Sequence, residues 1–518
     1  MKRTIKDSLV KRLLALCFLL FVVGLVTPSA AGRSEAPAAR APAPHSAEGS
    51  QSGTEAGQQA AFSIPLPIPP LLEGTEKNGV LHFNLQVQAG EREFYPGAVS
   101  STLGYNGNYL GPTIRVQRGD NVRIDVENQL NEATTVHWHG AHVPAKMDGG
   151  PHQQVPANSS WQASFPIDQE AATLWYHPHL IPTTAEQVYR GLAGLFIIED
   201  ENSKTLPLPR RYGENDIPII LQERRFQRDG RITYDPSMPD VMRGYSGNAI
   251  LVNGELQPYL EIDRGVLRLR LLNGSNSSVL RIQLENQDSF LQIASDGGFL
   301  EQPVQMNALV LSPAERAEIL IDFSDVQEGE KLHLFAETNG GETYRVMQLI
   351  GSGDESSSTG SNEAAAAYPD SSLKLNTIEP IPASEAERTR SFIMSTMGPG
   401  GRLTINGKTM DMNRIDERVP LGATEIWEIQ HGRGMMGRMM NVPHSFHVHD
   451  GQFQILSVNG RPPSANEAGW KDTVLLWPGD VIRIIKRFED YTGIYMYHCH
   501  LLEHEDAGMM GQFEVVEP

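Results

Sequence analysis

Hydrophobic and polar residues alternate along much of the chain in short runs separated by glycine-containing turns. The stretch "RVQRGDNVRIDVEN" from Arg115 places apolar side chains at every second position on both sides of an Arg-Gly turn. This period of two is typical of a β-strand with one face towards a core. Long helices are not evident, so the pattern predicts a chain built of strands.

The same pattern recurs in two further places. "EIDRGVLRLRLLN" from Glu261 aligns with the first stretch, turn and strands in register, and "NGKTMDMNRIDERVPLGATEIWEI" from Asn406 is a looser third copy. Three related β units imply three sandwiches of similar topology, with apolar residues inward and polar residues outward. The 48 glycines and 34 prolines agree with an all-β chain that has many turns.

Composition suggests where the domains begin and end. Residues 1–31 place five basic residues before the apolar run "LLALCFLLFVVGLV" and small residues after it, which predicts an export signal. That run is short for a membrane span, although an uncleaved anchor stays open. Residues 32–61 form a low-complexity spacer. The three domains are expected at 62–205, 206–350 and 379–518, with a polar linker at 351–378.

Charge and cysteine content exclude several classes of function. The formal net charge is −20, which disfavours nucleic acid and anionic membranes as partners. Cys17 lies inside the export signal, so Cys499 is the only thiol of the mature chain. A single cysteine excludes an intramolecular disulfide and zinc sites built from paired cysteines. Cys499 is then either an inert core residue or a reactive or metal-binding group.

Ten of the 16 histidines fall in four clusters, "HWH" at 137–139, "HPH" at 177–179, "HSFHVH" at 444–449 and "HCHLLEH" at 498–504. Residues i and i+2 of a strand point the same way, so each His-x-His pair offers two imidazoles to one place. One such pair is commonly structural. Four pairs, two in the first unit and two in the last, predict a shared metal site.

Cys499 lies between two of these histidines and must face the opposite side of its strand. One tripeptide therefore reaches two different sites. His444 and His504 remain after the pairs are counted. Two histidines, one thiolate and a weak axial thioether form the trigonal site that selects copper for electron transfer. Met509 is well placed as the axial group, and Met510 is the rival.

The set "HWHG", "WYHPH", "HSFHVH" and "HCHLLEHEDAGMM" resembles the four signature motifs of the multicopper oxidases, from about residue 65 to the end of the chain. The resemblance implies three cupredoxin-like, Greek-key β-sandwich domains. The first and last domains would each supply half of a trinuclear copper site, and the middle domain would be structural.

Carried over by position, the resemblance implies four copper ions. A type 1 copper would be held by His444, Cys499, His504 and Met509, a type 2 copper by His137 and His447, and two type 3 coppers by His139, His177 and His500 and by His179, His449 and His498. Asp148 in "KMDGGP" and Glu505 match the acidic positions to which the family assigns proton delivery. The alternative is that neither residue is functional, with Asp148 a turn-forming residue and Glu505 a solvated charge on a loop.

The function expected from the resemblance is laccase-like oxidation of phenolic or similar organic donors, coupled to reduction of dioxygen to water. The alternative is a cuprous oxidase for copper tolerance, because "INGKTMDMN" and "GWKDTV" are most like bacterial copper efflux oxidases. The linker contains no methionine, which favours organic donors. Met435, Met436, Met439 and Met440 could either dock cuprous ion or pack around an apolar pocket.

Two further classes fit less well. A non-catalytic cupredoxin scaffold conflicts with the intact ligand set, and a copper nitrite reductase typically has two domains per chain and lacks the type 3 arrangement. The expected partners are dioxygen and a small electron donor, with no nucleic acid and no membrane span after signal removal. The protein is expected to be a monomer outside the cytoplasm, either secreted, periplasmic or in the cell envelope.

Overall fold

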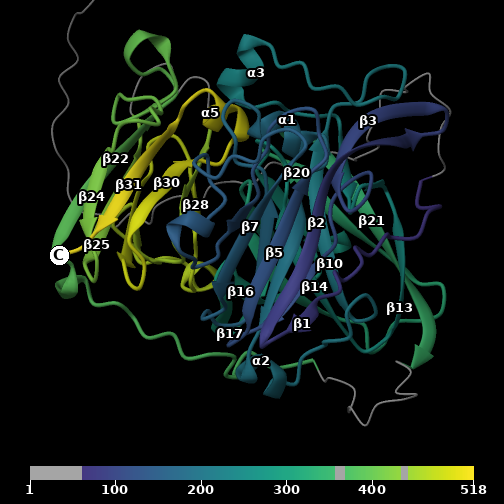
Figure 1. Cartoon of the computed structure of the whole chain (residues 1–518). Coiled ribbons are helices and arrows are strands. Elements are labelled where there is room, and N and C mark those ends of the chain that lie inside the picture. Colours follow the sequence, from purple (N-terminus) through teal and green to yellow (C-terminus); the bar gives the residue numbers. More distant parts are fainter. Residues whose placement is uncertain (1–60, 356–367, 433–441) are drawn as a thin grey trace, which may run out of the picture. The chain divides into compact units, whose positions relative to one another are not determined.

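The computed structural model describes residues 61–355, 368–432 and 442–518. Strands dominate these residues and form six sheets, which make three sandwich domains as predicted (Figure 1). The predicted export signal, nearly all of the predicted spacer, part of the predicted linker and the methionines at 435, 436, 439 and 440 lie outside the described residues. No helix in the described part of the chain is long and apolar enough to span a membrane.

The first domain consists of two sheets, with strand orders β1-β2-β5-β7, where β3 also pairs with β2, and β4-β9-β8-β6. Its strands are β1 (Thr75–Lys77), β2 (Val80–Tyr95), β3 (Ala98–Tyr105), β4 (Ile114–Gln117), β5 (Asn121–Asn128), β6 (His137–His139), β7 (Ser159–Pro166), β8 (Ala172–His177) and β9 (Gly194–Glu199). On β5 the apolar residues Val122, Ile124 and Val126 are fully buried. The alternation read from the sequence therefore fills this core.

The second domain has a seven-stranded sheet, β12-β11-β10-β14-β19-β16-β17, and a five-stranded sheet, β13-β21-β20-β15-β18. Its strands are β10 (Asp216–Arg224), β11 (Ala249–Val252), β12 (Glu255–Leu256), β13 (Tyr259–Arg264), β14 (Val266–Asn273), β15 (Leu280–Leu284), β16 (Phe290–Ser295), β17 (Gly298–Met306), β18 (Leu309–Leu311), β19 (Arg316–Asp322), β20 (Lys331–Thr338) and β21 (Thr343–Glu355). The last strand, β21, runs past residue 350 into the expected linker.

The third domain has two five-stranded sheets, β23-β22-β25-β29-β27 and β24-β31-β30-β26-β28. Its strands are β22 (Arg388–Ser395), β23 (Thr404–Ile405), β24 (Glu417–Pro420), β25 (Thr424–His431), β26 (His444–Val448), β27 (Gln454–Val458), β28 (Thr473–Leu476), β29 (Val481–Arg487), β30 (Gly493–Cys499) and β31 (Met510–Val516). In Figure 1 these strands are green to yellow and lie together.

Helices serve as short connections, none longer than six residues in the described ranges. They are the α-helices α1 (Thr184–Tyr189), α2 (Glu201–Thr205), α3 (Met238–Arg243) and α5 (Leu502–Asp506), and the 3-10 helices η1 (Ala145–Met147), η2 (Glu285–Gln287), η3 (Ala383–Glu385), η4 (Pro399–Gly401) and η5 (Ala465–Glu467).

The three related sequence units occupy equivalent places in the three domains. They form the strand pairs β4–β5, β13–β14 and β24–β25, in which the first strand pairs in parallel with β9, β21 or β31. The second strand joins the other sheet and pairs in parallel with β2, β10 or β22. Each connecting turn contains a glycine with positive φ, namely Gly119, Gly265 and Gly422. The sequence repeat is therefore a repeat of topology.

Strand β14 departs from the expectation that polar residues face outwards. Arg268 and Arg270 alternate with leucines, as on a half-solvated strand, yet both arginines are buried. Arg270 binds Asp216 through Nε at 2.7 Å and Glu318 through Nη1 at 3.0 Å. It also donates to Thr173 of the first domain at 2.9 Å. The polar face of β14 is covered because the first domain packs against it, and ion pairs offset the cost of burying its charges.

Candidate metal centre

The histidine pairs lie on adjacent strands at equivalent places in the first and third domains. Strands β6 and β8 are antiparallel with His137 opposite His177, and β26 and β30 are antiparallel with His447 opposite His498. Residues directly opposite one another project from the same face of a sheet. All eight imidazoles of the four His-x-His pairs are buried. Each terminal domain thus presents two strands of histidines to one place.

Histidines of the first domain stack directly on histidines of the third. The rings of His137 and His449 lie 4.0 Å apart between centroids at an interplanar angle of 18°. The rings of His139 and His447 lie 3.7 Å apart at 16°. The cluster therefore lies between these two domains, and neither domain contains it alone.

Three ring nitrogens converge on one point. The Nε2 atoms of His179 and His449 are 3.1 Å apart, those of His179 and His498 are 3.1 Å apart, and those of His449 and His498 are 3.4 Å apart. Burial lowers the pKa of His179 and of His449 well below the usual value, so these rings are neutral. Three neutral imidazoles with facing nitrogens have the donor set and spacing of a transition-metal site.

Several other rings of the histidine cluster are oriented by a hydrogen bond at Nδ1. His137, His177 and His447 donate from Nδ1 to the backbone carbonyls of Asp148, Pro178 and Asp472 at 2.8, 2.7 and 2.8 Å. A carbonyl oxygen only accepts, so each Nδ1 carries the proton and each Nε2 keeps its lone pair. An outer hydrogen bond that fixes the tautomer is usual for a metal-binding histidine.

His139 is oriented the other way round. Its Nε2 donates to the Asp472 carboxylate at 3.1 Å, while its Nδ1 faces Nε2 of His177 at 3.4 Å. The Nε2 atoms of His137 and His447 and both ring nitrogens of His500 are buried and have no hydrogen-bond partner among the described residues. Buried nitrogens without partners need an explanation, and bound metal ions supply one. The donor set thus fits copper.

Two aspartates hold the stacked ring pairs in matching ways. The Asp148 carbonyl accepts from His137 and its carboxylate accepts from Nδ1 of His449, both at 2.8 Å. The Asp472 carbonyl accepts from His447 and its carboxylate from His139. Burial raises the pKa of both carboxyl groups. Asp148, which the sequence offered as either a turn residue or a functional acid, lies buried against two predicted ligands.

Glu505 of α5 lies close to one histidine from each half of the cluster. Its Oε1 lies 3.2 Å from Nδ1 of His179, and its Oε2 lies 3.2 Å from Nδ1 of His498. The side chain is fully buried. Glu505 is therefore not a solvated loop charge.

A second cluster surrounds Cys499 on the opposite side of β30. Its Sγ lies 3.5 Å from Nδ1 of His444 and 3.5 Å from Nδ1 of His504. Burial raises the pKa of the Cys499 thiol to about 12 and lowers the pKa of His504 to about 4. A thiolate at this buried position requires a bound cation, and two neutral imidazoles with one sulfur match the ligand set of a type 1 copper.

Strand register distinguishes Met509 from Met510. Met510 pairs directly with His498, so its side chain projects from the face that carries the histidine cluster. Met509 accepts a backbone hydrogen bond from Cys499 at 3.0 Å and belongs to the same buried core as Cys499. The register favours Met509 as the axial group.

The outer edges of the type 1 histidines are covered by different residues. Nε2 of His444 lies 3.4 Å from the Thr396 hydroxyl, and the ring stacks on His431 with centroids 4.5 Å apart. Nε2 of His504 lies 3.4 Å from the backbone carbonyl of Met242 in α3. One rim of this site therefore comes from the second domain.

Comparison with known proteins assigns the family. Profiles described as multicopper oxidase match residues 86–203 and 380–518. The chain is 41% identical over 442 residues to the multicopper oxidase Mco of Staphylococcus aureus, covering 85% of this chain and 90% of that protein. It is 36% identical over 471 residues to the cell division protein FtsP of Escherichia coli K12, covering 89% and 93%.

A solved structure gives the same result. The laccase-like multicopper oxidase of the lignin-degrading bacterium Ochrobactrum sp. superposes with a TM-score of 0.78 at 36% identity, covering 87% of this chain and 100% of that one. The chain belongs to the multicopper oxidase family and is a copper-dependent oxidoreductase that uses dioxygen.

Sequence reasoning did not select Asp472, and it gave His431, His142 and His152 a supporting or surface role because they lie outside the motifs. Asp472 lies in "GWKDTV", where nothing in the neighbouring residues indicates that its side chain meets a histidine 333 positions away. His431 ends β25 outside the motifs and reaches His444 only through the sheet packing. Of the other histidines outside the motifs, His142 binds Asp450 and His152 binds Gln512.

Proposed function

We propose that the protein is a laccase-like multicopper oxidase that removes single electrons from phenolic or similar organic donors. Four donor molecules each lose one electron, and one dioxygen takes up four electrons and four protons to give two water molecules. Bound copper would supply the one-electron chemistry. The observation that carries this proposal is the pair of buried clusters joined by His498, Cys499 and His500.

The copper ligands follow the geometry described above. His444, Cys499, His504 and Met509 would hold a type 1 ion, and the eight remaining histidines would hold one type 2 and two type 3 ions. Cys499 lies between two histidines of the other cluster, so the backbone connects the two clusters covalently. With copper bound, Cys499 would offer a short covalent path between the type 1 ligands and the histidines of the other cluster.

Asp148 and Glu505 would manage protons for this reaction. Each carboxylate is buried beside two of the proposed copper ligands, within hydrogen-bond distance of at least one of them. Reduction of dioxygen to water consumes protons at the cluster, and positioned carboxyl groups are suited to supply them.

The surroundings of His504 support an organic donor. The helix α3 covers the outer edge of this ring, and its Val241 and Met242 pack against the apolar core of the third domain. An apolar rim suits a planar aromatic molecule. The Ochrobactrum relative is described as oxidising lignin model compounds.

Oxygen uptake by the purified, copper-loaded protein should be faster with a methoxyphenol than with cuprous ion at matched concentrations. Met435, Met436, Met439 and Met440, which lie outside the described residues, would then be packing residues. Replacing all four by Leu should leave phenol oxidation within about twofold, because Leu and Met have similar volumes.

Met412→Leu is the matched control, because Met412 is an exposed methionine of the same domain that lies outside the segment 435–440 in sequence. The protein would instead be a cuprous oxidase if it preferred cuprous ion and if this preference were lost in the quadruple Leu variant but kept in Met412→Leu. Thioethers suit that ion.

We also propose that the protein acts outside the cytoplasm as a monomer after its signal is removed. Cell fractionation followed by mass spectrometry of the mature N-terminus tests the location, and light scattering tests the mass. A full-length chain held in the membrane would mean an uncleaved anchor.

A further inference from the structure

Arg316 connects all three domains through a single side chain. It is the first residue of β19 in the second domain, and its side chain is fully buried. Nε donates to the carbonyl of Thr173 in the first domain at 3.0 Å. Nη1 and Nη2 donate to the carbonyls of Ala314 and Asp296 at 3.0 and 2.9 Å, within the second domain.

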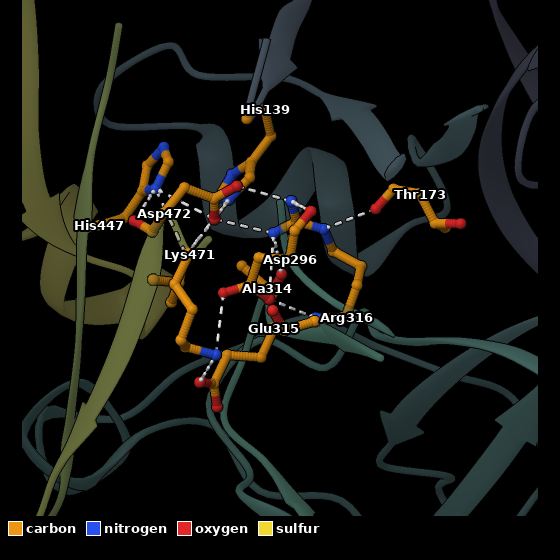
Figure 2. Close-up of polar contacts among 12 residues, drawn as sticks. His139, Thr173, Asp296, Ala314, Glu315, Arg316, His447, Lys471 and Asp472 are labelled. Atoms are coloured by element: carbon orange, nitrogen blue, oxygen red, sulfur yellow. Dashed lines mark hydrogen bonds and ion pairs between the residues drawn. The ribbon is translucent and has the colours of Figure 1, made fainter. Parts of the chain in front are cut away.

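The two remaining N–H groups of Arg316 bind Asp472 of the third domain. Nη1 lies 2.8 Å from Oδ1 and Nη2 lies 2.6 Å from Oδ2 (Figure 2). A guanidinium has five N–H donors, so every donor is used. The paired contact fixes the plane of the carboxylate as well as its position.

Asp472 passes this constraint on to two proposed copper ligands. The same Oδ1 that binds Arg316 accepts from Nε2 of His139, and the backbone carbonyl accepts from Nδ1 of His447. Figure 2 shows the rings of His139 and His447 and the Arg316 guanidinium grouped around Asp472. The tautomer of His139, whose Nδ1 faces the cluster, depends on that carboxylate.

The backbone near His139 is adapted to this ion pair. Gly140 follows the "HWH" motif and has a φ of 85°, a conformation that side chains disfavour. A Cβ atom at this position would lie 2.5 Å from Oδ2 of Asp472 and 2.8 Å from Nη2 of Arg316. Glycine is therefore required where the ion pair passes the β6 strand.

Asp148, the counterpart of Asp472, has no such cation beside it in the part of the chain that the structure describes. Its ion pairs in the described part of the chain are with His137 and His449. The two halves of the cluster thus resemble one another in their histidines and aspartates but differ in charge. Within the described ranges, a guanidinium holds and neutralises the carboxylate of the Asp472 half and not that of the Asp148 half.

We propose that Arg316 is a positioning residue of the trinuclear centre, acting through Asp472 to fix the ring orientations of His139 and His447. The second domain, expected from the sequence to be structural, thereby supports copper binding in the other two. This inference rests on the proposed copper ligands but not on the identity of the electron donor.

A purely structural role for Arg316 makes a different prediction. Lys471 also joins the second and third domains, through Asp296 at 3.0 Å and Glu315 at 3.0 Å. Domain docking therefore does not depend on Arg316 alone. If Arg316 only stabilised the fold, its replacement would weaken copper binding at both clusters together. If Arg316 positions the ligands, its replacement weakens copper binding at the trinuclear centre selectively.

Arg316→Lys tests the proposal, because lysine keeps the charge but cannot bind both carboxylate oxygens and three carbonyls in one plane. We expect copper affinity at the trinuclear centre to fall about 10–100-fold, as for the loss of residues that orient metal ligands. The type 2 signal in electron paramagnetic resonance and the near-ultraviolet type 3 absorption should weaken or shift. The blue type 1 absorption should persist.

Arg268→Lys is the matched control. Arg268 is a buried arginine of the same domain, paired with Glu318 at 2.9 Å, and it contacts none of the histidines. This variant should keep all three copper signals. The proposal would be overturned if Arg316→Lys kept its type 2 and type 3 signals as fully as Arg268→Lys does. It would also be overturned if Arg316→Lys lost the type 1, type 2 and type 3 signals together.

Asp472→Asn covers the case in which Arg316→Lys does not fold. Asparagine preserves the size of the side chain and the backbone carbonyl but binds the guanidinium without a full charge. The same selective change in type 2 and type 3 signals is expected, and unchanged signals would contradict the proposal. These readouts need no donor, so a protein that oxidises no phenol still tests the inference about Arg316.

Discussion

Cys499→Ser is expected to abolish the blue colour of the copper-loaded protein and the oxidation of every donor. A serine hydroxyl is a hard, neutral oxygen that does not replace a thiolate on copper. Donor oxidation should fall by more than the roughly 10–100-fold that follows loss of a residue that merely supports a metal ligand. Visible absorption and oxygen uptake measure the two effects.

The trinuclear centre should keep its copper in this variant, because its histidine ligands remain in place. Cys17→Ser is the matched control, since Cys17 is the other cysteine of the chain and lies in the proposed signal. It should leave colour and turnover unchanged. A Cys499→Ser protein that is still blue and active would disprove the assignment of the type 1 site.

Glu505→Gln is expected to slow reduction of dioxygen by about 100-fold, within the range that general acid and base groups contribute. Glutamine keeps the size of the side chain, but its amide has no acidic proton. It also presents an N–H₂ group in place of one of the two carboxylate oxygens, each of which now lies 3.2 Å from a histidine Nδ1. Reduction of the type 1 copper by donor should be unchanged.

Two measurements separate these half-reactions. Loss of the blue colour without oxygen measures electron uptake from the donor. Reoxidation after dioxygen is added measures the reduction of dioxygen. Glu503→Gln is the control, because Glu503 is a buried glutamate of the same helix that binds Asn276 at 3.0 Å and Tyr234 at 3.2 Å. Equal reoxidation rates in Glu505→Gln and the parent would remove Glu505 from proton delivery.

The sandwich architecture could be predicted because its signal is local. Alternating residues such as Val122, Ile124 and Val126 mark one strand within a few positions, and the recurring unit shows that the arrangement is used three times. The burial of Arg268 and Arg270 could not be predicted in this way. Their alternation matches that of a solvent-exposed face, and only the packing of another domain turns that face into an interior.

Part of the candidate site could likewise be predicted from local sequence and part could not. The His-x-His pairs are visible in sequence because strand geometry alone makes both rings face one side. Asp472 and Arg316 are 156 positions apart, and neither lies in a pattern that requires the other. Whether a carboxylate meets an imidazole from another domain depends on how the domains dock, which no short segment encodes.

The division of the histidines between the first and third domains also orders events during biosynthesis. The ribosome makes the "HWH" and "HPH" segments early. Their imidazole rings have no stacking partners until β26 and β30 have been made and folded. A partly synthesised chain therefore lacks the cage that would retain several copper ions. Retention of the full set of copper ions would therefore require the whole chain, and a chain that folds without metal could receive its copper last.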